Sequence, residues 1–267
     1  MHTRLWDFVV LQGMESITSR NNKTIIEVSK LKDKKHRDKT GLYCFEGRKL
    51  FLEAKNSGVC FSSVFVREDS YAENKNLLDI PDTSIYTVSE SVYSKLSEDK
   101  APDGIFAVAK KPNTPCDIKG KCFILSEVRD PGNIGTCIRT ARAFGIDTLI
   151  LHGCADIYNP KVIRSTMGAF FRQNLYCTED ITKTLDSLEN MGYRILPTAL
   201  SENSVSLSDI DIDSRTAFIV GNEGHGISDS ILSRYSSSVI IPMKGDTESL
   251  NASVAASLLM WELSKTV

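Results

Sequence analysis

Apolar and polar positions alternate in short blocks along the first 110 residues. Apolar residues at helical spacing indicate amphipathic helices, and short apolar runs rich in β-branched residues indicate strands. We predict helices over 25–31 (the first) and 49–56 (the second), with Gly58 at the C-terminal end of the second and a further helix capped by Ser89. We predict strands at 64–66, 85–88 and 105–109. This pattern favours a small α/β domain.

The rest of the chain repeats strand and helix signals more regularly. We predict strands at 122–125, 148–151, 193–196, 217–220 and 239–241. We predict helices over 134–144, from Asn159–Pro160 onward, over 181–191 and over 250–263. Continuous apolar strands separated by helices are typical of a mostly parallel sheet that is covered on both faces. The predicted fold class is α/β throughout.

A linker is predicted over residues 111–116, where two prolines lie among polar residues and interrupt any helix. The chain then divides into a domain over 14–110 and a domain over 117–267. Met14 is followed by a polar, basic segment that would make a natural start, so residues 1–13 are predicted to be an unstructured extension.

Composition places the chain among ordinary globular proteins, with 41% hydrophobic and 25% charged residues. No apolar run approaches the roughly 18 residues of a membrane span, and no signal peptide is evident. The seven cysteines form no CxxC pair, and the four histidines are dispersed. We therefore expect reduced thiols, a cytoplasmic protein and no metal site.

Positive charge is concentrated near the N-terminus although the net charge is −2. Residues 20–49 contain ten Lys or Arg and four acidic residues, a local excess of six. Clustered cations neutralise nucleic-acid phosphates, but a solvated helix end is an equally good explanation of this segment by itself. The predicted RNA-facing residues are Lys30, Lys32, Lys34, Lys35, Arg37 and Lys39.

Three loops in the second half each follow a predicted strand and contain glycine with polar residues. They span residues 129–135, 221–226 and 241–253. In open α/β sheets, ligands bind beyond the carboxyl ends of strands. A single such loop would be explained as a tight turn, but three favour a binding site. The chain has no GxGxxG fingerprint after its first strand and no P-loop, which argues against a nicotinamide-dependent oxidoreductase.

These loops resemble the three motifs of the SpoU/TrmH family of SPOUT-class methyltransferases. The matching stretches run from Asp130 to Gly145, from Phe218 to Ile227, and from Ile241 to Ala255. Residues 44–54 resemble, more weakly, the N-terminal substrate-binding domain of the family. The resemblance implies a parallel-sheet catalytic domain with a C-terminal trefoil knot, homodimerisation, S-adenosylmethionine as methyl donor, and transfer to a ribose 2′-hydroxyl.

Site residues follow from the same resemblance. The implied catalytic residues are Asn133, Arg139, Glu223, Ser249 and Asn251. The implied cofactor-binding residues are Thr198, Gly221, Ile241, Met243 and Leu250. Because a guanidinium keeps its proton, Arg139 is expected to stabilise alkoxide charge and to hold phosphate, while a phosphate oxygen or water takes the proton. Asn133 would orient Arg139 or the ribose, or would simply cap its helix.

Other polar residues near the motifs have weaker claims. Arg142 and Arg164 are candidate phosphate contacts, with ion pairing inside the protein an equal alternative. His225 is flanked by glycines in a turn, so we do not count it as a site residue. The predicted substrate is RNA, most specifically ribosomal RNA, because of the separate N-terminal domain. The alternatives are tRNA as the substrate, and a non-catalytic RNA-binding or assembly factor with this fold.

Overall fold

The computed structural model describes residues 15–112, 116–201, 203–244 and 249–266. The chain divides into two compact units: unit 1 comprises 1–113 with 158–171, and unit 2 comprises 114–157 with 172–267. The division at 113–114 falls within the predicted linker, whereas the predicted extension 1–13 lies outside the described residues. The sequence placed 158–171 in the second domain; in the structure this segment packs with unit 1.

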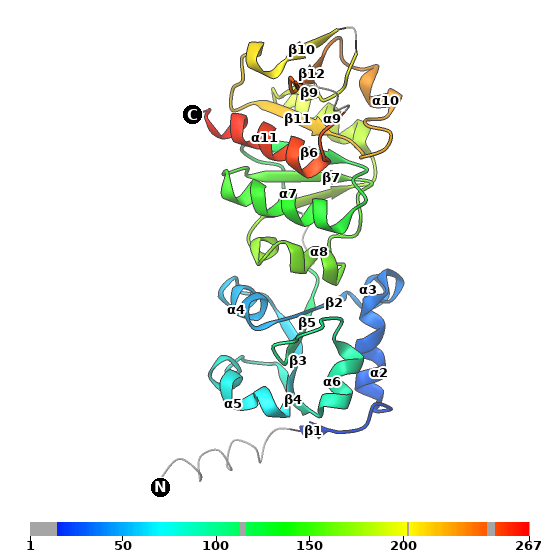
Figure 1. The fold of residues 1–267 in the computed structure, drawn as a ribbon, viewed down its shortest axis with the longest axis vertical. Helices are drawn as coiled ribbons and strands as arrows, with labels where there is room; N and C mark the ends of the chain where they lie inside the picture. The colour runs from blue at the N-terminus through cyan, green and yellow to red at the C-terminus, as the bar shows by residue number, and fades with distance from the viewer. Residues whose placement is uncertain (1–14, 113–115, 202, 245–248, 267) are drawn as a thin grey trace. The chain divides into compact units, whose positions relative to one another are not determined.

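Unit 1 is built on a mixed sheet with strand order β1-β4-β3-β5-β2 (Figure 1). Strand β5 pairs antiparallel with β2 and β3, and β4 pairs parallel with β1 and β3. The strands are β1 (Glu15–Ile17), β2 (Leu42–Glu46), β3 (Phe61–Arg67), β4 (Ser84–Val88) and β5 (Ile105–Lys110). The helices include α2 (Lys23–Ser29), α3 (Lys34–Thr40), α4 (Arg48–Asn56), α5 (Tyr71–Asn74), α6 (Glu90–Leu96) and α8 (Pro160–Ser165).

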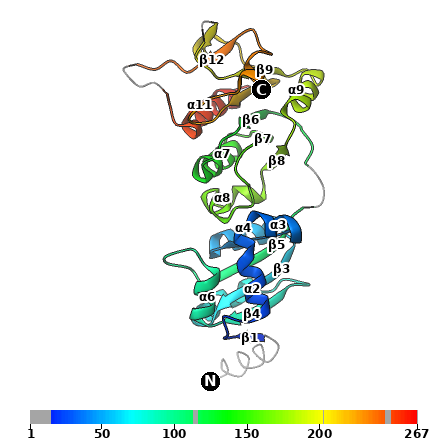
Figure 2. The ribbon, with the colours of Figure 1, turned by 90° about the vertical axis from the view of Figure 1, so that its right-hand side faces the viewer.

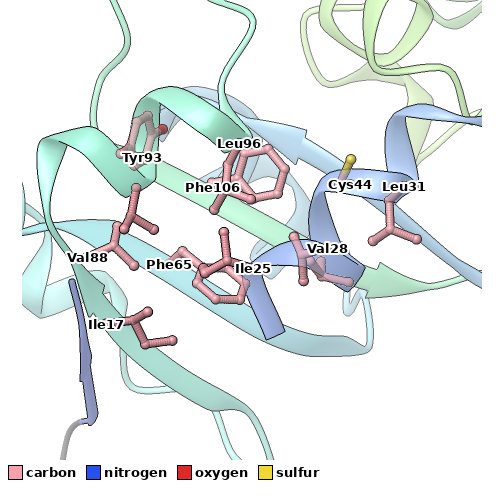
Figure 3. Packing of buried hydrophobic residues seen from close by; sticks show 12 residues of the cluster. Ile17, Ile25, Val28, Leu31, Cys44, Phe65, Val88, Tyr93, Leu96 and Phe106 are labelled. Carbon is pink, nitrogen blue, oxygen red and sulfur yellow. The ribbon is translucent and has the colours of Figure 1, made fainter. Parts of the chain in front are cut away.

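Helices α2 and α6 bury their apolar faces on one side of this sheet (Figure 3). Ile25 and Val28 of α2 lie over Phe65 and Phe106, which project from neighbouring strands. The i, i+3 spacing of the α2 pair places both side chains on one helix face, and this spacing is why the segment forms an amphipathic helix. Burial of these side chains, rather than helix propensity, stabilises an element of only seven residues.

The segment 158–171 joins unit 1 through aromatic and ionic contacts with β2. The Tyr43 ring lies 5.0 Å from the Tyr158 ring, and the Phe45 ring lies 5.0 Å from the Phe171 ring, centroid to centroid. The guanidinium of Arg164 donates to the Glu46 carboxylate over 2.5 Å. These contacts explain why the segment belongs with unit 1 although its neighbours in sequence belong to unit 2.

Unit 2 contains a parallel sheet with strand order β8-β7-β6-β11-β9, and a small parallel pair of β10 with β12. The strands are β6 (Cys122–Ser126), β7 (Thr148–His152), β8 (Asn174–Thr178), β9 (Arg194–Pro197), β10 (Ser204–Ser206), β11 (Thr216–Val220) and β12 (Ser238–Ile240). The helices include α7 (Pro131–Ala143), α9 (Ile181–Asn190), α10 (Asp229–Leu232) and α11 (Ala252–Ser264). The predicted α/β class and the parallel sheet are confirmed.

Helices cover both faces of the unit 2 sheet (Figure 2). Helices α7 and α11 lie side by side on one face (Figure 1), and α9 packs on the other through Leu185 and Leu188. Within β6, Cys122 and Ile124 face α9, so the intervening Phe123 faces the opposite layer. Because all these strands are parallel, the loops that leave β6, β7, β9 and β11 emerge along one edge of the sheet, as the site requires.

Candidate active site

The loop after β11 is a tight turn over residues 222–226. The backbone amides and carbonyls of Asn222 and Gly226 bond to each other in both directions, at 2.9 and 3.0 Å. A Cβ on Gly221 would lie 2.4 Å from the carbonyl carbon of Gly226, so no larger residue fits at position 221. The Asn222 side chain accepts the Gly224 amide at 2.8 Å and stabilises the turn from inside.

The same asparagine joins this turn to the loop after β6. Its Nδ2 donates to the backbone carbonyl of Glu127 over 2.9 Å, across 95 residues of sequence. The Glu127 side chain returns to the turn, with Oε2 lying 3.0 Å from Nε2 of His225. This donation from His225 holds the pKa of the Glu127 carboxyl below its ordinary value. The turn after β11 and the start of the loop after β6 are therefore physically connected.

Helix α7 starts within the first motif, and Asp130 is its N-cap. The Asp130 side chain accepts the backbone amide of Asn133 at 2.8 Å, and Pro131 occupies the first helical position. The alternative role considered for Asn133, that of N-cap, is therefore wrong, and its side chain is free for other contacts. The Asp–Pro dipeptide was the sequence signal for this helix start.

Asn133, Glu223 and Asn251 form a hydrogen-bonded chain across the three motif loops. Asn133 Nδ2 donates to Glu223 Oε1 over 2.7 Å, and Asn251 Nδ2 donates to Asn133 Oδ1 over 3.1 Å. The Asn251 Oδ1 accepts the amides of Ser253 and Val254 at the start of α11. An ionised carboxylate only accepts, so this sequence of bonds fixes which way each amide points. The predicted convergence of these three residues is thus seen directly.

The remaining two implied catalytic residues make no such contact. Ser249 is exposed two residues before Asn251, which is the actual N-cap of α11. Arg139 is exposed on α7, more than two turns beyond the Pro131 start. Within the described residues, its guanidinium forms no hydrogen bond or ion pair. The structure therefore leaves this cation available, but does not itself join Arg139 to the Asn133 chain.

The implied cofactor-binding residues lie on adjoining chain segments at the end of the sheet. Thr198 follows β9, and its hydroxyl donates to the Ile219 carbonyl, two residues before Gly221, over 2.9 Å. Thr198 also bridges to Val239, two residues before Ile241. Met243 is exposed and Leu250 is half-buried, on either side of residues 245–248, which lie outside the described residues. The set is mostly small or apolar and follows three neighbouring strands.

These residues fit a nucleoside-containing cofactor in chemical character. In ligand pockets, apolar surface encloses a ring such as adenine, and main-chain groups can supply its hydrogen bonds. At Gly221 the absence of a side chain lets the backbone of Gly226 and Ile227 pack directly against the end of β11. Among the described residues, no group of three or more His, Cys, Asp or Glu could hold a metal ion.

The predicted RNA-facing cluster of unit 1 is mostly engaged in internal contacts. Lys30 pairs with Glu27 at 2.6 Å, Lys34 pairs with Asp38 at 2.9 Å, and Lys32 donates to a main-chain carbonyl. The ammonium groups of Lys35 and Lys39 are exposed and make no hydrogen bond or ion pair with the part of the chain that is described.

Arg37 corrects the prediction for this cluster. Its side chain is buried, at 2% exposure, and Nη1 donates to the carbonyls of Leu31 and Lys32 over 2.7 and 2.8 Å. It therefore holds two helical segments together and does not face RNA. Arg164 is likewise paired, with Glu46, so the ion-pair alternative holds for it. Arg142 is exposed and forms no hydrogen bond or ion pair within the described residues.

Sequence comparison identifies both parts of the chain. Residues 121–261 match the model of the SpoU rRNA Methylase family, and residues 22–107 match that of the MRM3-like substrate binding domain. The chain is 33% identical over 251 residues to a protein of Bacillus subtilis (strain 168) named 23S rRNA (guanosine(2553)-2'-O)-methyltransferase RlmP. That alignment covers 94% of this chain and 99% of the relative.

Solved structures agree over nearly the full length. An AdoMet-bound rRNA methyltransferase from Sinorhizobium meliloti aligns with a TM-score of 0.82 and 26% identity, over 94% of this chain and 97% of the other. A structure described as an RNA 2'-O ribose methyltransferase aligns with a TM-score of 0.79 and 28% identity, over 93% and 97%. Fold and site thus define a methyltransferase of the SPOUT type.

The chain belongs to the SpoU rRNA methylase family. The family, the RNA methyltransferase class and S-adenosylmethionine as the methyl donor, all predicted from the sequence, are confirmed. The trefoil knot stays a prediction. No helix among the described residues is both long and apolar enough to span a bilayer.

Proposed function

We propose that this protein methylates a ribose 2′-hydroxyl of ribosomal RNA, and that the Asn133–Glu223–Asn251 chain and Arg139 form its catalytic site. The observation that supports this most strongly is the hydrogen-bonded contact of Asn133 with both Glu223 and Asn251, from loops 90 and 118 residues away. The match of residues 22–107 to a substrate-binding domain and the rRNA named for the Bacillus relative favour ribosomal RNA over tRNA.

Asn133, Glu223 and Asn251 act by orienting the acceptor ribose. Each Asn amide already uses one donor and its oxygen, which leaves one further N–H on each of Asn133 and Asn251 for the substrate. The second oxygen of Glu223 can accept from a ribose hydroxyl. The order of the bonds begins at the N-terminal amides of α11 and ends at the carboxylate, so the three side chains are held in one arrangement before the substrate arrives.

Arg139 acts on charge. Removal of the 2′-hydroxyl proton leaves negative charge on oxygen. An exposed guanidinium with no partner among the described residues can stabilise that charge while it binds a neighbouring phosphate. The proton passes to a phosphate oxygen or to water. Arginine keeps its own proton and takes no part in that transfer as a base.

Thr198, Gly221, Ile241, Met243 and Leu250 would hold S-adenosylmethionine. When bound, the cofactor supplies an electrophilic methyl group on a sulfonium, so the protein's task is alignment of the acceptor oxygen. Thr198 has both its amide and its hydroxyl engaged with the Ile219 carbonyl, and it therefore serves to join β9 to β11 beside the cofactor.

A homodimer is also part of the proposal. Val254, Leu258 and Trp261 lie on one stripe of α11 at i, i+4 and i+7, and each side chain is 41–49% exposed. The Trp261 ring packs on Phe144 at the C-terminal end of the neighbouring helix α7, 5.4 Å between centroids. An apolar stripe on an otherwise buried helix suits a second copy of this chain. A Leu258→Asp variant should sediment as a monomer in analytical ultracentrifugation.

The test of function compares RNA from cells with and without this protein. Mapping of 2′-O-methylation should find one ribosomal RNA position that loses its methyl group in the deletion strain. The purified full-length protein with S-adenosylmethionine should restore it on RNA from that strain. Restoration on tRNA alone would move the substrate to tRNA. Failure to bind S-adenosylmethionine and to methylate any RNA would favour the non-catalytic RNA-binding alternative. The cytoplasmic location belongs to the same proposal.

A further inference from the structure

Glu127 is held in a backbone conformation that its residue type rarely adopts. Its φ is +61°, in the left-handed region, where a side chain is disfavoured and glycine is usual. The Asn222 side chain bonds to the main-chain carbonyl of Glu127, and a glycine would offer the same carbonyl. The Glu127 side chain must therefore be explained by a contact of its own, because conformations of this kind persist where the surroundings hold them and are frequent at functional sites.

The contact of that side chain is with His225. Glu127 Oε2 lies 3.0 Å from His225 Nε2, and the His225 side chain is otherwise 63% exposed. Glycines at 224 and 226 flank the histidine, so neighbouring side chains do little to fix its position. Gly226 has a positive φ of 71°, and a Cβ there would meet nothing within 4 Å. The contact with Glu127 is thus the side-chain contact that positions the His225 ring, while Asn222 Oδ1 accepts the backbone amides of Gly224 and His225 at 2.8 and 3.3 Å.

The turn is attached to segment 127–133 at both ends of that segment. At one end, Glu127 contacts Asn222 and His225; at the other, Asn133 contacts Glu223. Glu223 therefore lies between two residues of the turn that are tied to Glu127. The His225–Glu127 contact is therefore one of the bonds that link this segment to the turn that carries Glu223.

We propose that His225 and Glu127 are a pair of positioning residues, which hold turn 222–226 so that Glu223 stays bonded to Asn133 for methyl transfer. This inference rests on the proposed function, since the Asn133–Glu223 contact matters only in a working site. The pair acts through Glu223 and does not itself contact the reacting atoms. His225 was not counted as a site residue from its sequence context, and the geometry assigns it this role.

The test measures kcat and KM of the full-length protein on RNA from the deletion strain. His225→Ala and Glu127→Ala should each lower kcat about fivefold, the upper limit for an exposed pair, with unchanged KM for RNA and for S-adenosylmethionine. The double variant should be no slower than either single one, because both remove the same contact. His225→Gln keeps an N–H donor and should recover the rate to within about twofold.

Two further variants separate positioning from other roles. Glu127→Gly removes the carboxylate and suits the positive φ, so its Tm should not fall although its kcat does. A rate that followed stability would make the pair merely structural and overturn the proposal. His225→Phe keeps an aromatic face but cannot bond to Glu127, and it should be as slow as His225→Ala. Full activity of His225→Phe together with a raised KM for RNA in His225→Ala would overturn the proposal. It would mean that the ring of residue 225 stacks on an RNA base.

The controls keep this inference apart from the proposed function. Arg234→Gln breaks an ion pair with Asp186 in the same unit, at 2.5 Å, and should leave kcat unchanged. If the wild-type protein methylates no RNA, the proposed function fails, and the positioning role that rests on it fails with it. If the wild-type and Arg234→Gln proteins are active and His225→Ala matches them in kcat, the positioning pair is overturned while the function stands.

Discussion

Two polar regions of this protein use their side chains in opposite ways. In unit 2, Asn133, Glu223 and Asn251 bond to one another across 90 and 118 residues of sequence. In unit 1, the basic segment 30–39 bonds mostly to its own neighbours, as Lys30 does to Glu27 and Lys34 to Asp38. Contacts between distant loops build a site, whereas contacts within a few residues stabilise the local helices.

This difference explains why the positions of polar residues after strands predicted a site better than the number of positive charges did. Polar residues that follow parallel strands must meet along one sheet edge, so their convergence is imposed by the fold. A count of lysines and arginines imposes no such convergence, since each cation can pair locally or become buried. Arg37 shows the extreme case, with its guanidinium enclosed and bonded to two carbonyls. Substitutions can separate the two regions, because those in the site of unit 2 should change activity and those in the basic segment should change stability.

The largest effect is expected at Arg139. Arg139→Ala should lower kcat by about 10²–10³, the range seen when one group that stabilises an oxyanion is removed. Because no described residue uses this guanidinium, the free energy of unfolding should change little. Methyl incorporation into RNA and urea unfolding measure the two quantities. Lys183→Ala, which removes an exposed cation from α9 on the opposite face of the sheet, is the control and should stay close to wild-type activity. Equal activity of the two variants would remove Arg139 from the site.

Arg37 should show the reverse behaviour, with a large loss of stability and little loss of RNA affinity per folded molecule. Arg37→Met leaves the Leu31 and Lys32 carbonyls without their donor, and we expect the free energy of unfolding to fall by about 2–3 kcal/mol. Lys35→Ala, at an exposed position nearby, should leave stability unchanged. A stable Arg37→Met protein with weakened RNA binding would show that Arg37 contacts RNA, as the count of positive charges had predicted.

Asn133 tests whether the long-range contacts serve catalysis. Asn133→Ala leaves Glu223 without its donor and Asn251 without its acceptor, and kcat should fall about tenfold, as expected for loss of a hydrogen bond to a charged group. Asn133→Ala and Glu223→Ala should be non-additive in a double-mutant cycle, because they share one contact. Additive losses in kcat would mean that the two residues act independently.

The fold was predictable where apolar periodicity was strong. All the central strands of unit 2 and the parallel sheet followed from continuous apolar runs such as Phe123–Leu125. Strand β8 at the sheet edge was missed because its residues are half-buried or exposed and its pattern is mixed. Strand β2 was missed, although all but its first residue are buried, because its apolar run is short and ends in the charged Glu46.

The site was predictable only through the motif loops. The order of residues around Asn133 and Asn251 indicated the convergence, but nothing local indicated that Arg37 is buried or that Glu127 has a positive φ. Such features depend on which other segment packs against the residue. The segment 158–171 illustrates this point: its sequence reads as part of the second domain, yet its aromatic residues pack with Tyr43 and Phe45 of the first.

The smallest effect concerns Asp38, which lies in the basic segment and pairs with Lys34 of that segment and with Lys111 after β5. Hydrogen bonds from Lys111 at 2.8 Å and Lys34 at 2.9 Å lower the pKa of Asp38 from 3.8 to about 2. Since the folded pKa lies below the unfolded one, this stabilisation is present above pH 4 and is lost as the pH falls through about 2. The Asp38 carboxylate is exposed to solvent, so we expect these bonds to add only about 0.5 kcal/mol to the free energy of unfolding. Asp38→Asn should lower the free energy of unfolding by that amount at pH 7, as measured by urea unfolding, and should match wild type at pH 2. An undiminished difference at pH 2 would show that the contribution of Asp38 does not depend on its charge.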